Sequence, residues 1–232
     1  MSGSGWQLAL PFPINQRCVF GNFQVGANAE LLEHLHKMPH EPGFAGLMLW
    51  GALGAGVSHL LQASCQLYAE QGRRIAYLPL ARLGRQADIL DGMDGFDLVA
   101  LDDVQAWASE PALEAGLVGL YQSLLARGRH LLVGSSAAVG ASAFELADLA
   151  SRLAGLTSYQ VRSLNDQGKA QLLRSLAAQR GLGINDAVLR FWLARSDRAV
   201  GRLLDQFEQI DAAAMSAQRR VTIPLLKSVL DL

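Results

Sequence analysis

The stretch GLMLWGALGAGVSHLLQ at residues 46–62 constrains the fold of this chain more than any other feature. An apolar run precedes its glycines and a helical pattern follows them, which predicts a buried strand, a tight loop and a helix in direct succession. Glycine suits a backbone that takes positive φ or approaches a ligand, and the free N–H groups at a helix start attract anions. The sequence therefore predicts a phosphate-binding loop over residues 51–58.

One residue of this loop departs from the motif G-x-x-x-x-G-K-[ST], because Val57 stands where lysine is expected before Ser58. The lysine neutralises charge on the β- and γ-phosphates during phosphoryl transfer, and valine has no donor. Loss of such an electrostatic contact costs on the order of 3 kcal/mol of transition-state stabilisation. We expect a site that retains a diphosphate and is not an efficient ATPase. A glycine-rich turn without a ligand is the alternative.

Paired acids strengthen the case for nucleotide binding. Asp102 and Asp103 end the apolar segment FDLVALDD, one strand–helix unit after the loop. A carboxylate at the end of a neighbouring buried strand holds Mg²⁺ or its water opposite the loop hydroxyl. Ser58, Asp102 and Asp103 are therefore the predicted metal site, with acids that merely end a strand as the alternative.

The pattern along the whole chain predicts an α/β fold followed by helices. The strand segments GLMLWG, RRIAYLPL, FDLVALDD and RHLLVGSS alternate with helical segments, which is typical of a parallel sheet covered by helices on both faces. From about Ser163 four helical segments follow, each after Asn, Ser or Thr. We expect a flexible N-terminal arm over 1–16, an α/β nucleotide-binding domain over 17–162 and a small all-helical lid domain over 163–232.

Composition excludes several classes of protein. Half of the residues are hydrophobic and 18% are charged, which argues against disorder, and a net charge of −1 gives no basic footprint for duplex DNA. No apolar run reaches the roughly 18 residues of a membrane span and no secretory signal begins the chain, so we expect a cytoplasmic protein with no membrane partner. Cys18 and Cys65 are predicted to be free thiols. His34 and His36 face different sides of a helix and are interpreted as surface residues.

Several segments together resemble a known family. VFGNFQVGANAELL, LWGALGAGVSHLL, FDLVALDD, LADLASRL and the segment from Ser196 onward resemble the AAA+ domain of the bacterial replication initiator DnaA. The resemblance is strongest to the Hda family, short DnaA homologues that mediate regulatory inactivation of DnaA, and it covers residues 7–232. It implies an AAA+ P-loop domain with a helical lid, and an end after the lid where the initiator continues into a helix-turn-helix domain.

The resemblance assigns roles to matching positions. The implied nucleotide-binding residues are Val25, Gly26, Gly54, Ala55, Gly56, Val57, Ser58, His59 and Arg198, the last as a lid sensor. Arg152 matches the arginine finger, which in this family points to the nucleotide of a neighbouring protomer. Ordinary surface ion pairs are the alternative for both arginines. Asp103 replaces the usual catalytic glutamate and Ser136 stands at a sensor position, so these departures, like Val57, weaken hydrolysis in the chain's own site.

The N-terminal arm carries a second implied function. Gln7, Leu8, Leu10 and Phe12 resemble the hexapeptide with which replication proteins bind the β sliding clamp of DNA polymerase III, and alternating apolar side chains on an extended arm suit a hydrophobic cleft. An ordinary N-terminal strand is the alternative.

The implied function is negative regulation of DNA replication initiation. The implied partners are DnaA and the clamp, with DNA reached only through the clamp, and the implied cofactor is ADP or another nucleoside diphosphate with Mg²⁺. An autonomous ATPase of the initiator or helicase-loader type and a nucleotide-free scaffold are the rival interpretations. Self-association into a homo-oligomer is left open.

Overall fold

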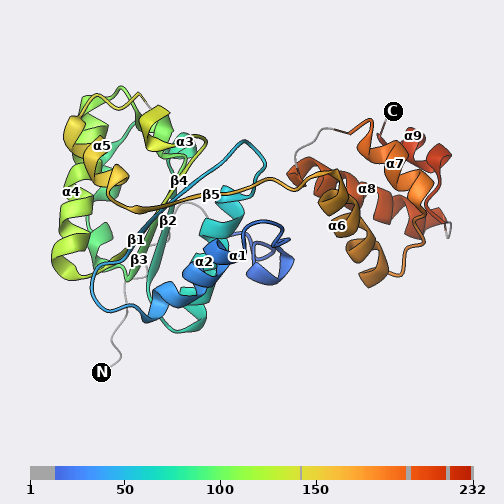
Figure 1. Cartoon of the computed structure of the whole chain (residues 1–232), viewed down its shortest axis with the longest axis horizontal. Coiled ribbons are helices and arrows are strands. Elements are labelled where there is room, and N and C mark those ends of the chain that lie inside the picture. The colour runs from blue at the N-terminus through green and yellow to red at the C-terminus, as the bar shows by residue number, and fades with distance from the viewer. Residues whose placement is uncertain (1–13, 142, 197–199, 218–219, 231–232) are drawn as a thin grey trace. The chain divides into compact units, whose positions relative to one another are not determined.

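A computed structural model describes residues 14–141, 143–196, 200–217 and 220–230 (Figure 1). The chain forms two compact units. The first contains the residues up to Phe23 together with Asn28–Gly51 and Val57–Val161. The second contains Gln24–Ala27, Ala52–Gly56 and Arg162–Leu232. The clamp-motif residues Gln7, Leu8, Leu10 and Phe12, and the implied sensor Arg198, lie outside the described residues.

The first unit is built on a five-stranded parallel sheet with the order β2-β3-β4-β1-β5. Its strands are β1 (Gly46–Trp50), β2 (Ile75–Pro79), β3 (Leu98–Asp102), β4 (His130–Ser135) and β5 (Thr157–Gln160). Every side chain of β3 and β4 is buried, which explains their unbroken apolar sequence. Because the strands are parallel, the chain leaves β1, β3 and β4 at the same edge. The predicted α/β class is confirmed.

Strand β5 was not predicted from the sequence, which indicated four strands. It pairs with β1 at the sheet edge, with Leu47 beside Thr157 and Trp50 beside Gln160. Its side chains are mostly exposed, so a polar edge strand of this kind has no apolar pattern to reveal it.

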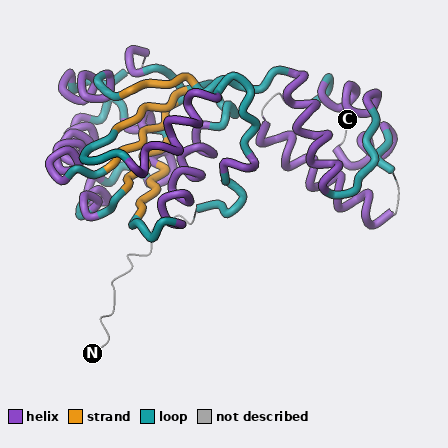
Figure 2. Tube along the Cα trace, turned by 60° about the horizontal axis from the view of Figure 1, so that its bottom comes forward, coloured by secondary structure: helices purple, strands orange, loops and turns teal. Residues whose placement is uncertain are grey.

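Helices cover both faces of the sheet (Figures 1 and 2). Helices α1 (Ala29–Lys37) and α2 (Val57–Glu70) lie on one face, while α4 (Pro111–Arg127) and α5 (Ala147–Ala154) lie on the other (Figure 1). The shorter elements are α3 (Leu80–Leu83) and the 3₁₀ turns η1 (Phe20–Asn22), η2 (Met38–His40), η3 (Ala87–Leu90), η4 (Met93–Gly95), η5 (Val104–Trp107) and η6 (Val139–Ala141). Helix α4 ends at Gly128, whose φ of 60° allows its N–H to bond the carbonyls of Leu124 and Leu125.

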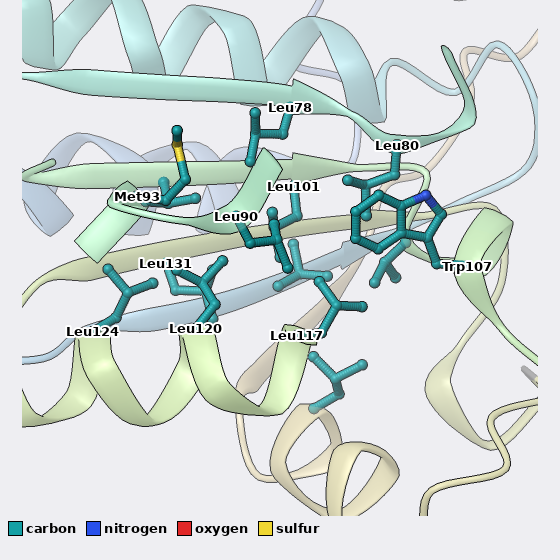
Figure 3. Packing of buried hydrophobic residues seen from close by; sticks show 14 of the residues in the cluster. Leu78, Leu80, Leu90, Met93, Leu101, Trp107, Leu117, Leu120, Leu124 and Leu131 are labelled. Carbon is teal, nitrogen blue, oxygen red and sulfur yellow. The ribbon is translucent and has the colours of Figure 1, made fainter. Parts of the chain in front are cut away.

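The packing of α4 fixes the larger part of the core. Leu117, Leu120 and Leu124 project from α4 toward Leu101 of β3 and Leu131 of β4 (Figure 3). All five side chains are at most 6% exposed. Burial of each leucine contributes about 1.5–3 kcal/mol, so this layer holds the strands from which the candidate site projects.

The lid has a separate hydrophobic core. Its helices are α6 (Asp166–Gln179), α7 (Asp186–Leu193), α8 (Val200–Ala217) and α9 (Ile223–Leu230). Trp192 and Phe207 are fully buried in this core, and the Trp192 Nε1 donates to Gln206 at 2.8 Å. The Asn165 and Asn185 side chains cap α6 and α7 by accepting from the third N–H of each helix. The predicted helical lid is confirmed.

The structure places the cysteines and histidines that the sequence singled out. Cys18 and Cys65 are both free, and burial raises the pKa of Cys65 to about 12. His34 bonds the Tyr159 hydroxyl, His36 bonds the Leu32 carbonyl, and the described residues contain no cluster that would hold a metal through three His, Cys, Asp or Glu side chains. None of the described helices is long and apolar enough to cross a membrane.

A buried histidine anchors the start of β4. The Tyr68 hydroxyl and the His130 Nδ1 share a hydrogen bond, and the His130 ring also bonds the backbone of Glu41 and Gly43. Burial lowers the pKa of His130, and the Arg73 guanidinium lowers it further.

The depressed His130 pKa predicts a loss of stability at mildly acidic pH. The folded chain binds fewer protons than the unfolded chain below the unfolded histidine pKa of about 6.5, so the free energy of unfolding decreases as the pH falls through that value. His130→Gln is expected to cost about 1–3 kcal/mol at pH 7.5, because it unpairs buried groups, and to flatten this dependence. Urea unfolding at pH 7.5 and 5.5 measures both effects.

The exposed His40 provides the matched control. His40→Gln is expected to keep the wild-type pH dependence. An equally steep loss of stability in His130→Gln would show that another group is responsible, with His59, whose pKa burial also lowers, as the next candidate.

Candidate functional site

The glycine loop connects β1 to α2 with a backbone that suits anion binding. The Gly51 N–H bonds the Ser135 carbonyl at 3.2 Å, and the Ala55 N–H closes a turn on Ala52 at 2.9 Å. Gly54 and Gly56 have φ values of 79° and 105°, which side-chain-bearing residues rarely adopt. Helix α2 begins at Val57, so the N–H groups of its first turn have no helical acceptor and remain available to an anion.

The loop hydroxyl and the first acid of β3 lie together. The Ser58 hydroxyl bonds the Asp102 carboxylate, which also accepts from the Tyr77 hydroxyl at 2.6 Å and from the Asp103 N–H at 3.1 Å. Burial raises the pKa of Asp102, and these hydrogen bonds oppose the rise. A hydroxyl beside a carboxylate is a donor set that Mg²⁺ accepts when nucleotide phosphates complete its coordination. Tyr77, on the adjacent strand β2, was missed in the sequence.

Asp103 is held differently from Asp102. It follows β3 in a left-handed conformation with φ of 58°, and its Oδ1 accepts from the Gln105 side chain at 3.1 Å. The same Gln105 side chain accepts from the Ser136 N–H at 3.2 Å. Gln105 therefore links the second acid to the sensor position at the end of β4. Its only sequence signal is its place two residues after the acid pair.

The Val57 side chain packs against β4 beside Asp102. A Cβ added to Gly134 would lie 2.9 Å from Val57 Cγ1, 2.9 Å from Asp102 Oδ1 and 3.1 Å from Leu61 Cδ2. These contacts leave no room for a side chain at residue 134, a requirement that the sequence did not reveal. Val57 thus provides an apolar contact where the motif has a cation.

The ring of His59 faces the N-terminal segment. Its Nε2 donates to the Val19 carbonyl at 2.9 Å, and its ring centroid lies 5.7 Å from that of Phe23. Gln62 of the same helix accepts from the Asn15 N–H, and Gln66 donates to the Asn15 and Cys18 carbonyls. Residues 15–23 therefore run along α2, and only the backbone of His59 remains for a phosphate.

The residues implied for the base and ribose lie in the second compact unit. Val25 is 45% exposed. Gly26 has a φ of 49°, and a Cβ there would lie 3.5 Å from Leu164. This part of the implied site is thus an open loop beside the segment that leads into α6.

Arg152 is separated from the glycine loop by the sheet. It lies on α5, and α5 and α2 cover opposite faces (Figure 1). Its side chain is 26% exposed, with Nε 2.9 Å from Asp148 Oδ1 and Cζ 5.3 Å from the centroid of the Tyr121 ring. The structure therefore brings Ser58, Asp102 and Asp103 to one edge and leaves Arg152 outside that group.

Comparisons with known proteins bear on the fold and on the helical C-terminal unit. Residues 166–230 match the family described as Hda, lid domain. The structure is similar to domain III of the replication initiation protein DnaA from Thermotoga maritima, with 18% identity, a TM-score of 0.77 and coverage of 95% of this chain and 98% of that one.

Two further structures have the same fold. The AMPPCP-bound DnaA from Aquifex aeolicus is 18% identical, with a TM-score of 0.72 over 88% of this chain and 68% of that one. The RuvB Holliday junction branch migration motor of Thermotoga maritima is 15% identical, with a TM-score of 0.68 over 90% and 69%. This chain therefore has the fold of DnaA domain III, and its residues 166–230 match the lid domain of the Hda family.

Proposed function

We propose that this protein regulates replication initiation by stimulating ATP hydrolysis in DnaA. It holds a nucleoside diphosphate in its own site, docks on the β sliding clamp through Gln7, Leu8, Leu10 and Phe12, and supplies Arg152 in trans to the ATP of DnaA. ATP-bound DnaA is thereby removed and re-initiation is prevented. The observation that carries the proposal is the contrast between a phosphate loop without a lysine and an arginine on the opposite face of the sheet.

Nucleotide binding is supported by the loop and its neighbours. The positive-φ glycines, the free first turn of α2 and the Ser58–Asp102 contact suit a diphosphate with Mg²⁺. The Aquifex aeolicus DnaA with a similar fold is an AMPPCP complex. Val57 cannot follow charge that develops on a γ-phosphate, so the bound nucleotide is expected to act as a structural ligand.

Action on DnaA is supported by the combination of an Hda-type lid and a DnaA-like AAA+ unit. Identical AAA+ domains pair head to tail, so that a residue of one protomer completes the nucleotide site of its neighbour. An arginine supplied in trans accelerates GTP hydrolysis by roughly 10³–10⁵-fold in the related GTPases. Clamp docking raises the local concentration of the protein, so that weak contacts with DnaA suffice.

ADP is expected to stabilise the isolated protein against thermal unfolding. Ligand at a hundredfold excess over Kd adds about 2.7 kcal/mol. Gly56→Ala is expected to abolish this gain, because its φ of 105° aligns the loop N–H groups and is strained for alanine. Leu53→Ala, at the 95% exposed tip of the same loop, is the control and should retain it. A wild-type protein unaffected by ADP favours the nucleotide-free scaffold, and sustained ATP turnover by the isolated chain favours the autonomous ATPase.

Arg152→Ala is expected to reduce the stimulation of DnaA ATP hydrolysis to the basal rate. The assay measures phosphate release by DnaA with clamp and DNA present. Arg127→Ala is the matched control, because Arg127 is exposed on α4 and pairs with Asp94. Full stimulation by Arg152→Ala would refute the trans-acting arginine.

Deletion of residues 7–12 is expected to abolish co-elution with the clamp. Each buried apolar anchor contributes roughly 1.5–3 kcal/mol, so the loss of Leu8, Leu10 and Phe12 removes most of the binding free energy. Deletion of residues 1–5 is the control and should leave co-elution unchanged. Equal co-elution of both deletion variants would mean that the clamp is bound elsewhere or not at all.

A further inference from the structure

Asp148 and Tyr121 contact Arg152 from one side. Asp148 precedes Arg152 by one helical turn on α5, and its Oδ1 lies 2.9 Å from the Arg152 Nε. The Tyr121 ring of α4 lies beneath the guanidinium, with 5.3 Å between its centroid and Cζ. The Phe44 ring meets Tyr121 edge-on, with centroids 5.3 Å apart. Asp148 and Tyr121 thus contact the arginine, and Phe44 packs against Tyr121.

The closest contact with Asp148 is made by the Nε of the guanidinium. Nε is buried and makes no hydrogen bond to a described residue, so its approach to Asp148 is an ion pair without hydrogen-bond alignment. Among the described residues, no hydrogen bond joins Nη1 or Nη2 of Arg152 to an acceptor. A guanidinium carries four N–H groups on these two atoms. They remain available to an anion while the inner edge is held.

This geometry distinguishes two states of an arginine. A positioned arginine is held in one orientation with N–H groups left for another acceptor, whereas a stored arginine has most of its N–H groups engaged by a carboxylate. A carboxylate that stores an arginine binds it through two parallel N–H groups, which leaves few donors for another acceptor. Asp148 is 55% exposed, and its closest approach to Arg152 is at Nε. The pair therefore limits the rotation of the side chain without occupying the atoms that face a phosphate.

A buried carboxylate keeps α4 and α5 in fixed alignment. Glu114 of α4 is fully buried, and it accepts from the Leu146 N–H at 2.7 Å and the Glu145 N–H at 3.1 Å, at the start of α5. Its Oε1 also accepts from the Ser109 N–H at 2.9 Å. Tyr121 and Asp148 therefore contact Arg152 from two helices that the Glu114 carboxylate links by hydrogen bonds.

We propose that Asp148 and Tyr121 are positioning residues that pre-orient Arg152 for the nucleotide of a partner AAA+ protein. The inference rests on the proposed function and specifies how the arginine is held before the partner arrives. An arginine that is already restricted loses less side-chain freedom on contact, so more of the contact free energy is expressed in the transition state.

The test compares Asp148→Asn with Asp148→Glu in the stimulated DnaA hydrolysis assay. Asp148→Asn keeps the size and removes the charge, and it is expected to lower the stimulated kcat about three- to tenfold while the half-saturating concentration stays unchanged. Asp148→Glu is expected to restore most of the rate. Tyr121→Leu removes the ring and is expected to lower kcat to a similar extent.

Glu33→Gln is the matched control, because Glu33 pairs with Lys37 one turn later on α1 in an exposed ion pair. It should behave as wild type. A storage role for Asp148 predicts faster hydrolysis in Asp148→Asn, and a purely structural role predicts no change in kcat; either result overturns the inference. Arg152→Ala in the same assay distinguishes a failure of the proposed function from a failure of the positioning role. Full stimulation by Arg152→Ala would contradict the proposed function. An inactive Arg152→Ala together with a normal Asp148→Asn would contradict only the positioning role.

Discussion

The parallel pairing of the buried strands β1, β3 and β4 is the constraint on which the candidate site depends. Their common direction places the glycine loop, the acid pair and Ser136 at one edge of the sheet. The close approach of Val57, Asp102 and Gly134 then sets the fine geometry, because no Cβ fits at residue 134. Core packing by α4 holds these strands from the opposite face. The site is thus a product of the sheet rather than of the loop alone.

Much of this arrangement could be predicted from the sequence, and the exceptions have physical reasons. The strand–glycine–helix pattern and the apolar β3 and β4 give strong local signals, and Asn165 and Asn185 mark their helices. Strand β5 gave no such signal, because its residues are polar and mostly exposed and form a strand only through their pairing with β1. Gln105, Tyr77 and Gly134 were missed because their roles arise from contacts between strands distant in sequence.

His59 illustrates a different limit of the sequence. Its place after Ser58 implied a phosphate contact, whereas its ring bonds the Val19 carbonyl, forty residues earlier in the chain. The backbone of a motif is governed by local pattern, and a side chain on the motif takes whichever partner the fold provides. The same holds for Arg152. Its position in LADLASRL can be read from the local sequence, whereas its contact with Tyr121 arises from the packing of α4 on α5.

The course of residues 15–23 along α2 has a geometric consequence for clamp docking. Asn15 forms hydrogen bonds with Gln62 and Gln66 of α2, so the chain is held to that helix from Asn15 onward. From Phe12 to Asn15 an extended chain spans at most about 10 Å. In the proposed docking, a clamp bound through Phe12 would lie within that distance of Asn15, which would restrict the directions from which the α/β unit can meet a second protein on the same DNA. The protein would then meet its partner in a narrow range of orientations.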